Sequence, residues 1–279
     1  MRFEVKNKHL HCINNSFHHS HGSNHVVEPG FKWLHNQLPP DKSKPVVVID
    51  SLLTKFMPLH EKHDSVYAWL CESSAIIKDT IKFVKENLDD VMSCYKKVFS
   101  CDHSLVSMHD RIEFCPSGSN MPWVVDEPKD KTNLVSIIAS GKNTTDGHKK
   151  RNACVQYCLN NPGFDVYGRS FNPIDRKEEA MLPYMFSLVY ENHCYDKYYT
   201  EKITDCFASK TIPIYWGTKL VCEDFNPDGI MFVDDLNDTK ISPELYHSKL
   251  DAINDNYERV KKLVPADNII YEKITGDKL

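Results

Sequence analysis

The sequence predicts an α/β protein with two Rossmann-like domains that face a cleft. Residues 183–217 have the order strand, loop, helix, strand, and a βαβ unit of this kind requires a parallel sheet. Residues 45–50 form an apolar run that ends in an acid, which is typical of the centre of a second parallel sheet. The charged, proline-containing segment 123–133 has the composition of a linker. We therefore expect an N-terminal domain over residues 1–125, a C-terminal domain over 126–265 and a tail over 266–279.

Composition and charge exclude several classes of protein. The 279 residues suffice for two modest domains, and a net charge of -5 argues against a general nucleic-acid binder. No run approaches the ~20 apolar residues of a membrane span, and the N-terminus does not resemble a signal peptide. We expect no transmembrane segment and a cytoplasmic location, with the ten cysteines as buried thiols rather than disulfides.

Hydrophobic periodicity predicts the elements of each domain. In the N-terminal domain we expect strands at 3–5, 45–50, 66–72, 95–99 and 105–107, a helix over 76–88 and a loop over 113–122. In the C-terminal domain we expect strands at 134–139, 164–168, 186–190, 211–215 and 232–235, with helices over 149–159, 178–184 and 243–264 and one that is capped by Thr200.

Polar side chains gather between the strand at 186–190 and the helix that Thr200 caps. They are Asn192, Tyr198, Thr200, Glu201 and Lys202. In parallel sheets, ligands bind at the carboxyl ends of the strands, against helix N-termini. An acid beside a base, where a helix dipole points at an anion, favours a bound sugar phosphate.

Three short motifs in this region resemble the donor-binding signature of the alpha-1,3-fucosyltransferases, glycosyltransferase family 10. They are Tyr-Glu-Asn at 190–192, Tyr-Tyr-Thr-Glu-Lys at 198–202 and Ile-Pro-Ile-Tyr-Trp-Gly at 212–217. The continuation Glu-Asp-Phe-Asn-Pro at 223–227 is similar to the short bacterial members, and the resemblance covers about residues 134–235. It implies the GT-B architecture, two Rossmann-like domains facing a cleft, and a nucleotide-sugar donor.

The resemblance also implies roles for single residues. Arg151, in a Lys-Arg-Asn context, matches the family's phosphate-binding arginine, and Lys202 matches a second phosphate contact. Glu201 matches a residue that binds donor hydroxyls, while Asn192 and Tyr198 match further donor-contacting positions. We group Thr200, the expected cap, with these donor-binding residues. Because Arg151 is expected to be exposed at a helix start, the alternative for it is a solvated surface charge, and we favour the phosphate contact.

Two positions depart from the family motif. His193 replaces Ser or Thr after the Asn, and Lys197 replaces Asp before the Tyr. Both changes lie near the expected sugar, so the donor is left as GDP-fucose or, as the alternative, UDP-xylose.

Glu72 is the candidate general base. Its context, Trp-Leu-Cys-Glu-Ser-Ser at 69–74, resembles the family segment that holds the catalytic carboxylate. A carboxylate at a strand end can take the acceptor proton as the new bond forms. The alternative is an ordinary glutamate at the end of a strand.

Metal ligands are not expected. The adjacent pairs Asp89-Asp90 and Asp234-Asp235 lack the Asp-x-Asp spacing of metal-dependent glycosyltransferases. Basic side chains and helix termini are therefore expected to stabilise the leaving pyrophosphate, with no metal or other cofactor required.

The sequence thus predicts an inverting glycosyltransferase that moves L-fucose from GDP-fucose to a hydroxyl group of a glycan acceptor. One alternative keeps the fold and mechanism but uses UDP-xylose, and another is a silent nucleotide-sugar or carbohydrate-binding protein. The presence of Glu72 together with Arg151, Glu201 and Lys202 argues against the silent protein. Small size and the Asn-, Lys- and His-rich composition suggest a bacterial or virus-encoded enzyme.

Six histidines near the N-terminus allow three interpretations. They are His9, His11, His18, His19, His21 and His25, in an expected polar loop. The loop could bind a metal, could line the acceptor groove or could simply be exposed. We favour exposure, because no carboxylate or cysteine pair completes a recognisable metal site.

Overall fold

The computed structural model describes residues 8–14, 30–118, 120–124, 126–235 and 240–279. The chain divides into two compact units. The N-terminal unit contains the described residues up to 118 together with Val264–Leu279, and the C-terminal unit contains Asn120–Leu263. The division lies near the predicted linker, and the segment expected to be a tail is part of the N-terminal unit.

The N-terminal unit is built on one parallel sheet with the strand order β2-β1-β3-β4-β5-β6. Its strands are β1 (His9–Ile13), β2 (Lys32–His35), β3 (Val46–Ile49), β4 (Val66–Leu70), β5 (Val98–Ser100) and β6 (Ile112–Phe114). Its helices are α2 (Leu52–Lys55), η1 (Met57–Glu61), α3 (Lys78–Glu86), α4 (Leu88–Cys94), α5 (His103–Val106) and α11 (Ala266–Thr275). The central strands β3 and β4 are buried along their whole length, as their unbroken apolar runs predicted.

Helix α11 joins the core of the N-terminal unit although it comes from the end of the chain. Ala266, Ile270 and Tyr271 pack in one apolar cluster with Trp33 and its neighbours. Trp33 Nε1 donates a hydrogen bond of 2.7 Å to the buried carboxylate of Asp267. This bond satisfies the indole N–H in the core, so the last helix is fixed by both polar and apolar contacts.

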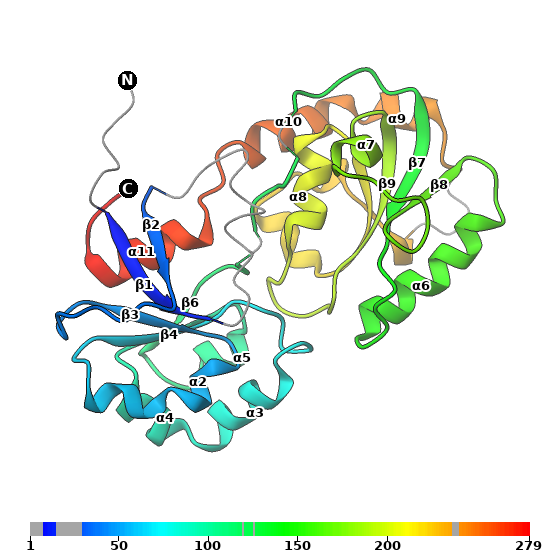
Figure 1. The fold of residues 1–279 in the computed structure, drawn as a ribbon. Helices are drawn as coiled ribbons and strands as arrows, with labels where there is room; N and C mark the ends of the chain where they lie inside the picture. Colours follow the sequence, from blue (N-terminus) through cyan, green and yellow to red (C-terminus); the bar gives the residue numbers. More distant parts are fainter. Residues whose placement is uncertain (1–7, 15–29, 119, 125, 236–239) are drawn as a thin grey trace. The chain divides into compact units, whose positions relative to one another are not determined.

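The C-terminal unit is built on a second parallel sheet, with the order β11-β10-β9-β7-β8. Its strands are β7 (Asn133–Ile138), β8 (Phe164–Tyr167), β9 (Tyr184–Tyr190), β10 (Ile212–Trp216) and β11 (Met231–Phe232). Its helices are α6 (Asp146–Leu159), α7 (Glu178–Met181), α8 (Glu201–Ala208), η2 (Lys219–Glu223), η3 (Pro227–Gly229), η4 (Val233–Asp235), α9 (Pro243–Ser248) and α10 (Leu250–Val260). Helix α6 lies on one side of this sheet and α8 and α10 on the other (Figure 1).

Both sheets have the same doubly wound order. In each, the first strand lies between the second and the third, so the chain reverses its direction of winding between β1 and β3 and between β7 and β9. Open α/β sheets bind ligands beside the carboxyl ends of the strands at such a switch point. The prediction of an α/β protein with two Rossmann-like parallel sheets is confirmed.

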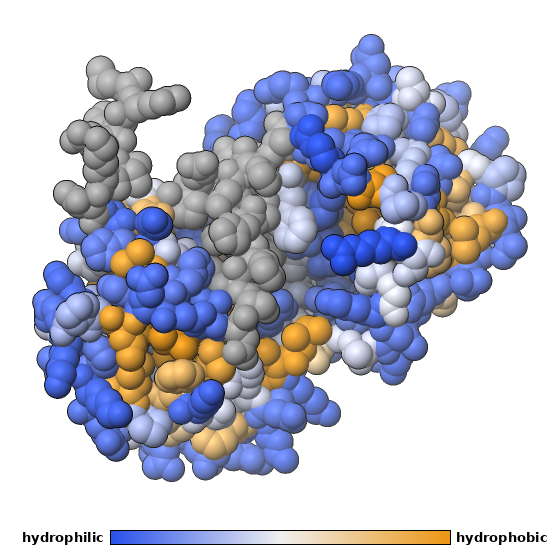
Figure 2. All heavy atoms as spheres, viewed as in Figure 1, coloured by the Kyte–Doolittle hydropathy of each residue, from blue (hydrophilic) through white to orange (hydrophobic). Residues whose placement is uncertain are grey.

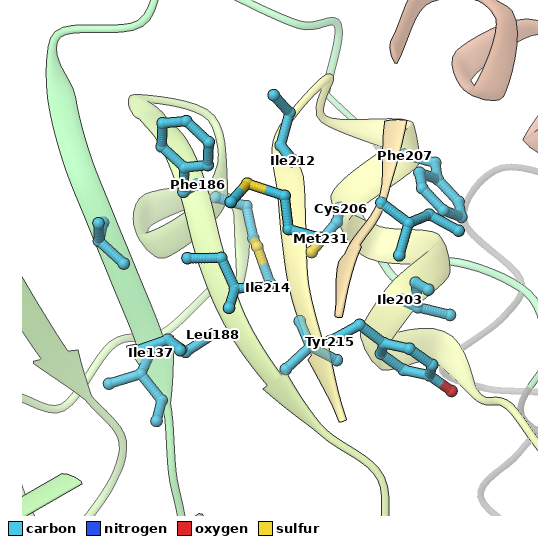
Figure 3. Close-up of a cluster of buried hydrophobic side chains, with 14 of the residues drawn as sticks. Ile137, Phe186, Leu188, Ile203, Cys206, Phe207, Ile212, Ile214, Tyr215 and Met231 are labelled. Carbon is cyan, nitrogen blue, oxygen red and sulfur yellow. The ribbon is translucent and has the colours of Figure 1, made fainter. Parts of the chain in front are cut away.

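The core of the C-terminal unit lies between its sheet and its helices. Ile203, Cys206 and Phe207 recur along α8 at helical spacing and are buried. Figure 3 shows these three side chains in one cluster with residues of β9 and β10. Hydrophilic residues cover most of the face seen in Figure 2, with apolar side chains visible only in patches.

Several predicted elements differ from those observed. Residues 105–107 are not a strand: Asp102 caps the short helix α5 by accepting the N–H of Ser104 at 2.9 Å. The predicted helix over 243–264 is two helices that meet at Lys249, and the strand expected at 232–235 gives way to η4. Helix α6 begins before residue 149, because Thr145 and His148 form a capping box.

The histidine-rich segment is also partly corrected. His9 and His11 were expected in a polar loop, but they lie on strand β1. That strand pairs with both β2 and β3. The strand expected at 3–5 and the other four histidines lie outside the described residues.

Candidate functional site

A cavity of about 180 Å³ lies at the switch point of the C-terminal unit. The ends of β7 and β9 form part of its wall, and the first turns of α8 form another part. The complete lining is Ile138, Ala139, Ser140, Arg151, Lys177, Met181, Ser187, Leu188, Val189, Tyr190, Glu201, Lys202 and Asp205. Of the six donor-binding residues predicted from sequence, the structure therefore brings Arg151, Glu201 and Lys202 into one cavity.

Arg151 presents a buried guanidinium group to this cavity. Its side chain lies on α6, the residue is only 6% exposed, and Nη2 donates a hydrogen bond of 3.2 Å to Ser140 Oγ. Within the described residues, its Nε finds no hydrogen-bond acceptor. Burial lowers the pKa of Arg151, and the negative charges of Glu191 and Glu201 oppose that shift. A buried cation with an unsatisfied N–H is suited to bind an anion.

The expectation that Arg151 is exposed was wrong, and the sequence did contain the relevant signal. Arg151, Val155 and Cys158 are spaced at i, i+4 and i+7 along α6, and all three are buried. The neighbouring Lys149 and Lys150 lie on the solvent side of the helix. The arginine therefore belongs to the inner face of α6, although the basic run around it suggested a solvated surface.

Glu191 organises the start of α8, and sequence reasoning missed it. It follows β9, is fully buried, and accepts the N–H of Thr200 at 2.9 Å and the hydroxyl of Thr200 at 2.8 Å. Lys202 Nζ lies 3.4 Å from its Oε2. Burial raises the pKa of Glu191, and Lys202 opposes this shift. Its place inside the Tyr-Glu-Asn motif was the available signal, because the loop after a parallel strand ends at the ligand side of the sheet.

Thr200, Glu201 and Lys202 form the capped first turn of α8. Thr200 is the N-cap, as predicted, and its Oγ1 accepts the N–H of Lys202 at 3.4 Å and the ammonium group of Lys202 at 2.9 Å. Glu201 lies beside Lys202 and is nearly fully buried. Burial alone would raise the pKa of Glu201, but the positive charges of Lys202 and Lys177 lower that pKa to about 2. Glu201 is therefore ionised at neutral pH.

Lys177 and Asp205 complete the charges of the cavity, and neither was predicted. Lys177 Nζ lies 2.6 Å from Asp205 Oδ2 and 3.6 Å from Glu201 Oε1. Asp205 is fully buried on α8, and its Oδ1 accepts the backbone N–H groups of Trp123 and Val124. The lining of the cavity thus includes three cations, from Arg151, Lys177 and Lys202, and the two lysines pair with buried carboxylates.

The first turn of α6 packs tightly against the backbone that follows β9. A Cβ atom on Gly147 would lie 1.7 Å from the carbonyl oxygen of Glu191, so only glycine fits at this position. The N–H of Gly147 donates to the carbonyl of Asn192 at 3.3 Å. Burial and the charge of Arg151 lower the pKa of the adjacent His148 to about 4, so the imidazole is neutral at pH 7. This close contact fixes the helix that carries Arg151 relative to the loop that carries Glu191.

Asn192, Tyr198 and Thr200 support the cavity and do not line it. Asn192 meets the start of α6 through its carbonyl. Tyr198 is buried, and its ring stacks on Tyr195 with 5.4 Å between the ring centroids. Lys197, which departs from the family motif, pairs with Asp224 at 2.8 Å and Glu223 at 3.2 Å.

Glu72, the candidate base, lies in the N-terminal unit directly after β4. Its N–H donates to Asp50 Oδ1 at 3.1 Å, and the N–H of Cys71 donates to the same oxygen at 2.8 Å. Asp50 has a positive φ of 49°, a conformation that aspartate adopts more readily than most residues. The carboxylate after β3 thus fixes the turn after β4 that carries Glu72.

The described residues contain no group of three or more His, Cys, Asp or Glu side chains placed to hold a metal ion. The charges around the cavity are instead paired with one another, as the ion pairs of Lys177 and Lys202 show. Across the same residues, no helix combines the length and the apolar character that crossing a membrane requires.

Comparison with known proteins gives matches of sequence and of fold. Residues 128–261 match the family model described as glycosyltransferase family 10 (fucosyltransferase) C-term. An alpha-(1,3)-fucosyltransferase of Helicobacter pylori, FucT, is 31% identical over 160 residues, which are 56% of this chain and 33% of that protein. The chain thus spans about a third of the length of this curated relative. These matches confirm the resemblance that the motifs predicted.

Two solved structures extend the similarity to the fold. A crystal structure of an alpha1,3-fucosyltransferase covers 99% of this chain and 90% of its own, with a TM-score of 0.51 and 17% identity. A second, of an alpha1,3-fucosyltransferase with GDP-fucose, covers 95% of this chain and 85% of its own, with a TM-score of 0.50 and 16% identity. At this level of identity the match concerns the fold, and it agrees with the predicted GT-B class.

Proposed function

We propose that this chain, whose residues 128–261 match the C-terminal family model of glycosyltransferase family 10, belongs to that family and transfers L-fucose from GDP-fucose to a hydroxyl group of a glycan acceptor. The observation that carries the proposal is the cavity at the switch point between β7 and β9. There the buried guanidinium of Arg151, with its unpaired Nε, lies in one lining with Glu201 and Lys202. The Helicobacter pylori relative is an alpha-(1,3)-fucosyltransferase, and this favours fucose as the donor sugar.

The charges of the cavity support a role in holding the donor. Departure of a nucleoside diphosphate places negative charge on its phosphate oxygens, and fixed cations in a site that excludes water stabilise such charge strongly. Arg151 and Lys202 hold the pyrophosphate in our proposal, and the N-terminus of α8 adds its dipole. Glu201, ionised at neutral pH, accepts hydrogen bonds from donor hydroxyl groups. No metal ion is required in this scheme, so we expect activity to persist in EDTA.

The transfer is proposed to invert the anomeric configuration. Glu72 takes the proton of the acceptor hydroxyl while that oxygen forms a bond to the anomeric carbon and the bond to the nucleotide breaks. One base is enough for such a single displacement. The turn that carries Glu72 is fixed by the backbone hydrogen bonds to Asp50, which supports a positioned carboxylate.

Donor identity is tested by thermal shift with GDP-fucose, UDP-xylose, UDP-galactose and GDP-mannose at equal concentration. A ligand that binds the folded protein raises its Tm, and at equal ligand concentration the rise is larger for the ligand with the lower Kd. We expect the largest rise with GDP-fucose. A larger rise with UDP-xylose would favour the xylosyltransferase, which the changes at His193 and Lys197 had left open.

Stereochemistry is tested on the product of the preferred donor. NMR of its anomeric proton should show the configuration opposite to that of the donor. Retention would overturn both the single displacement and the role given to Glu72. Donor binding without transfer to any glycan would instead support the silent nucleotide-sugar-binding protein.

A further inference from the structure

Lys177 lies at the centre of a charge network that the donor contacts alone do not explain. It precedes α7, and its ammonium group meets two buried carboxylates of α8, Asp205 at 2.6 Å and Glu201 at 3.6 Å. Nζ also lies 4.1 Å from the ring centroid of Trp123, a favourable cation–π distance. The side chain is 21% exposed and lines the cavity. This ammonium group is therefore held in place from three sides.

Glu201 needs such a cation because it is ionised in a buried place. The charged groups that face it come from four elements: Lys202 and Asp205 on α8, Arg151 on α6, Glu191 after β9, and Lys177 before α7. Two of them are carboxylates and repel it. A buried charge is stable only when it is compensated by partners at short distance. Lys177 and Lys202, both with Nζ at 3.6 Å from Oε1, are the closest cations to Glu201.

The ammonium group of Lys202 also contacts groups other than Glu201. Its Nζ lies 2.9 Å from Thr200 Oγ1 and 3.4 Å from Glu191 Oε2, in addition to Glu201. If Lys202 also contacts an anionic donor, its charge is shared among the donor, Glu191 and Glu201. Glu201 then depends on the ammonium group of Lys177 to stay ionised and in place.

We propose that Lys177 is a positioning residue of this cavity: its ammonium group compensates the buried carboxylate of Glu201 and so leaves Lys202 able to bind the phosphate groups of the donor. The proposal rests on the donor site proposed above. It differs from a purely structural role, in which Lys177 only pairs with Asp205 and stabilises the fold. If Lys177 compensates Glu201, its removal should raise the pKa of Glu201. If Lys177 only pairs with Asp205, the titration of Glu201 should not change.

The first experiment measures that titration without any donor. In protein with selectively ¹³C-labelled glutamate, the carboxyl signal of Glu201, assigned through its absence in Glu201→Gln, is followed from pH 7 to pH 4. In the wild type the signal should stay at its ionised position, because the pKa of Glu201 is about 2. In Lys177→Gln, loss of the positive charge raises this pKa, so the signal should begin to titrate as the pH falls within the range.

The variants are chosen to separate charge from structure. Lys177→Gln keeps a hydrogen-bond donor for Asp205, Lys177→Met removes it, and Lys177→Arg keeps the charge and should restore the wild-type titration. Lys261→Met removes a lysine that pairs with Glu258 on the surface of the same unit and should leave Glu201 unchanged. An unchanged titration of Glu201 in folded Lys177→Gln and Lys177→Met would overturn the proposal whatever the protein binds.

The second experiment measures the affinity for GDP-fucose against pH. We expect Kd for Lys177→Gln to be about tenfold higher than for the wild type at pH 7, comparable to the loss of one hydrogen bond to a charged group. The ratio should grow as the pH falls toward 5, because Glu201 becomes protonated only in the variant. Equal affinities and equal pH profiles would overturn the proposal. Failure of the wild type itself to bind GDP-fucose would refute the proposed donor, and the titration of Glu201 would still decide the role of Lys177.

Discussion

The two units share one strand order but use their carboxylates in different ways. In the N-terminal unit, Asp50 follows β3 and its carboxylate accepts the backbone N–H groups of Cys71 and Glu72. In the C-terminal unit, Glu191 follows the third strand of its sheet, β9, and meets both the backbone of Thr200 and the ammonium group of Lys202. Equivalent places in the two sheets thus hold a carboxylate that orders the next polypeptide turn.

The difference lies in what surrounds these carboxylates. The C-terminal unit adds Arg151, Lys177 and Lys202 around a cavity, and Arg151 keeps an unpaired, buried N–H. An unsatisfied buried donor costs free energy, and a ligand that accepts its hydrogen bond recovers that free energy. In the N-terminal unit, the carboxylate of Asp50 fixes the turn that carries Glu72. In the function proposed above, the C-terminal unit binds the donor and the N-terminal unit takes the proton, and variants in each unit should separate these two roles.

Glu72→Gln should have the largest effect on turnover. The amide keeps the shape and much of the hydrogen bonding of the glutamate but cannot accept a proton. We expect kcat to fall by roughly 10²–10⁴, with donor affinity nearly unchanged. Steady-state kinetics and direct donor titration measure the two quantities separately. Glu86→Gln, on an exposed glutamate of the same unit that pairs with Lys82, should alter neither. A variant with normal kcat would remove Glu72 from the mechanism.

Arg151→Ala should show the opposite pattern. Loss of a charge-assisted hydrogen bond to a phosphate costs about 1.5–3 kcal/mol, which corresponds to a donor Kd roughly 10- to 150-fold higher. Because Arg151 is buried beside Ser140, its removal should also lower the free energy of unfolding. Calorimetric titration with GDP-fucose and urea unfolding test both effects. Lys149→Ala, on the exposed side of the same helix, serves as the control, and equal donor affinity in both variants would contradict the assignment.

Local patterns predicted the elements and the motif residues of the site. The apolar run of β9, the cap at Thr200 and the charged pair Glu201-Lys202 are all determined by neighbours in the sequence, and each is found where it was expected. Lys177 could not be predicted this way, because its partners Glu201 and Asp205 meet it only after α8 has packed against the sheet. Arg151 is an intermediate case. Its spacing of four residues from Val155 indicated a buried position on α6, but the basic residues before it suggested an exposed one.

The position of the last helix, α11, also could not be predicted from local sequence patterns. Residues 266–279 carried no signal that linked them to the N-terminal unit, and they were expected to be a tail. The link depends on the hydrogen bond between Trp33 and Asp267 and on the packing of Tyr271, which are contacts between distant parts of the sequence. Such contacts are specified by tertiary packing and not by a local period.

Gly147→Ala should damage the C-terminal unit before it affects the N-terminal one. The added Cβ atom would overlap the carbonyl oxygen of Glu191, so α6 and the loop after β9 must move apart. Overpacking of this kind costs about 1–3 kcal/mol, and here it displaces backbone. Urea unfolding should show the loss of stability, and hydrogen exchange should locate it in α6. Gly141→Ala is the control, because its Cβ atom would meet Ser170 at an ordinary 3.4 Å. Equal stabilities of the two variants would contradict the close contact.

Ser140→Ala should have the smallest effect, and it tests whether the cavity is preorganised for the donor. Ser140 Oγ accepts the hydrogen bond of Arg151 Nη2 at 3.2 Å and thereby holds the guanidinium in the lining. Without it, Nη2 of Arg151 loses this acceptor and the guanidinium has more rotational freedom, so donor binding must restore its orientation. Loss of one such bond costs about 0.5–1.5 kcal/mol, so we expect a donor Kd roughly 2- to 12-fold higher. Ser136→Ala is the matched control: the Ser136 hydroxyl lies on β7, is buried and bonds to Ser187 on the neighbouring β9, so its loss should affect stability but not Kd. If Ser140→Ala lowered the stability but left the donor Kd unchanged, the bond between Ser140 and Arg151 would contribute to folding only. The guanidinium of Arg151 would then take its binding orientation only on donor binding.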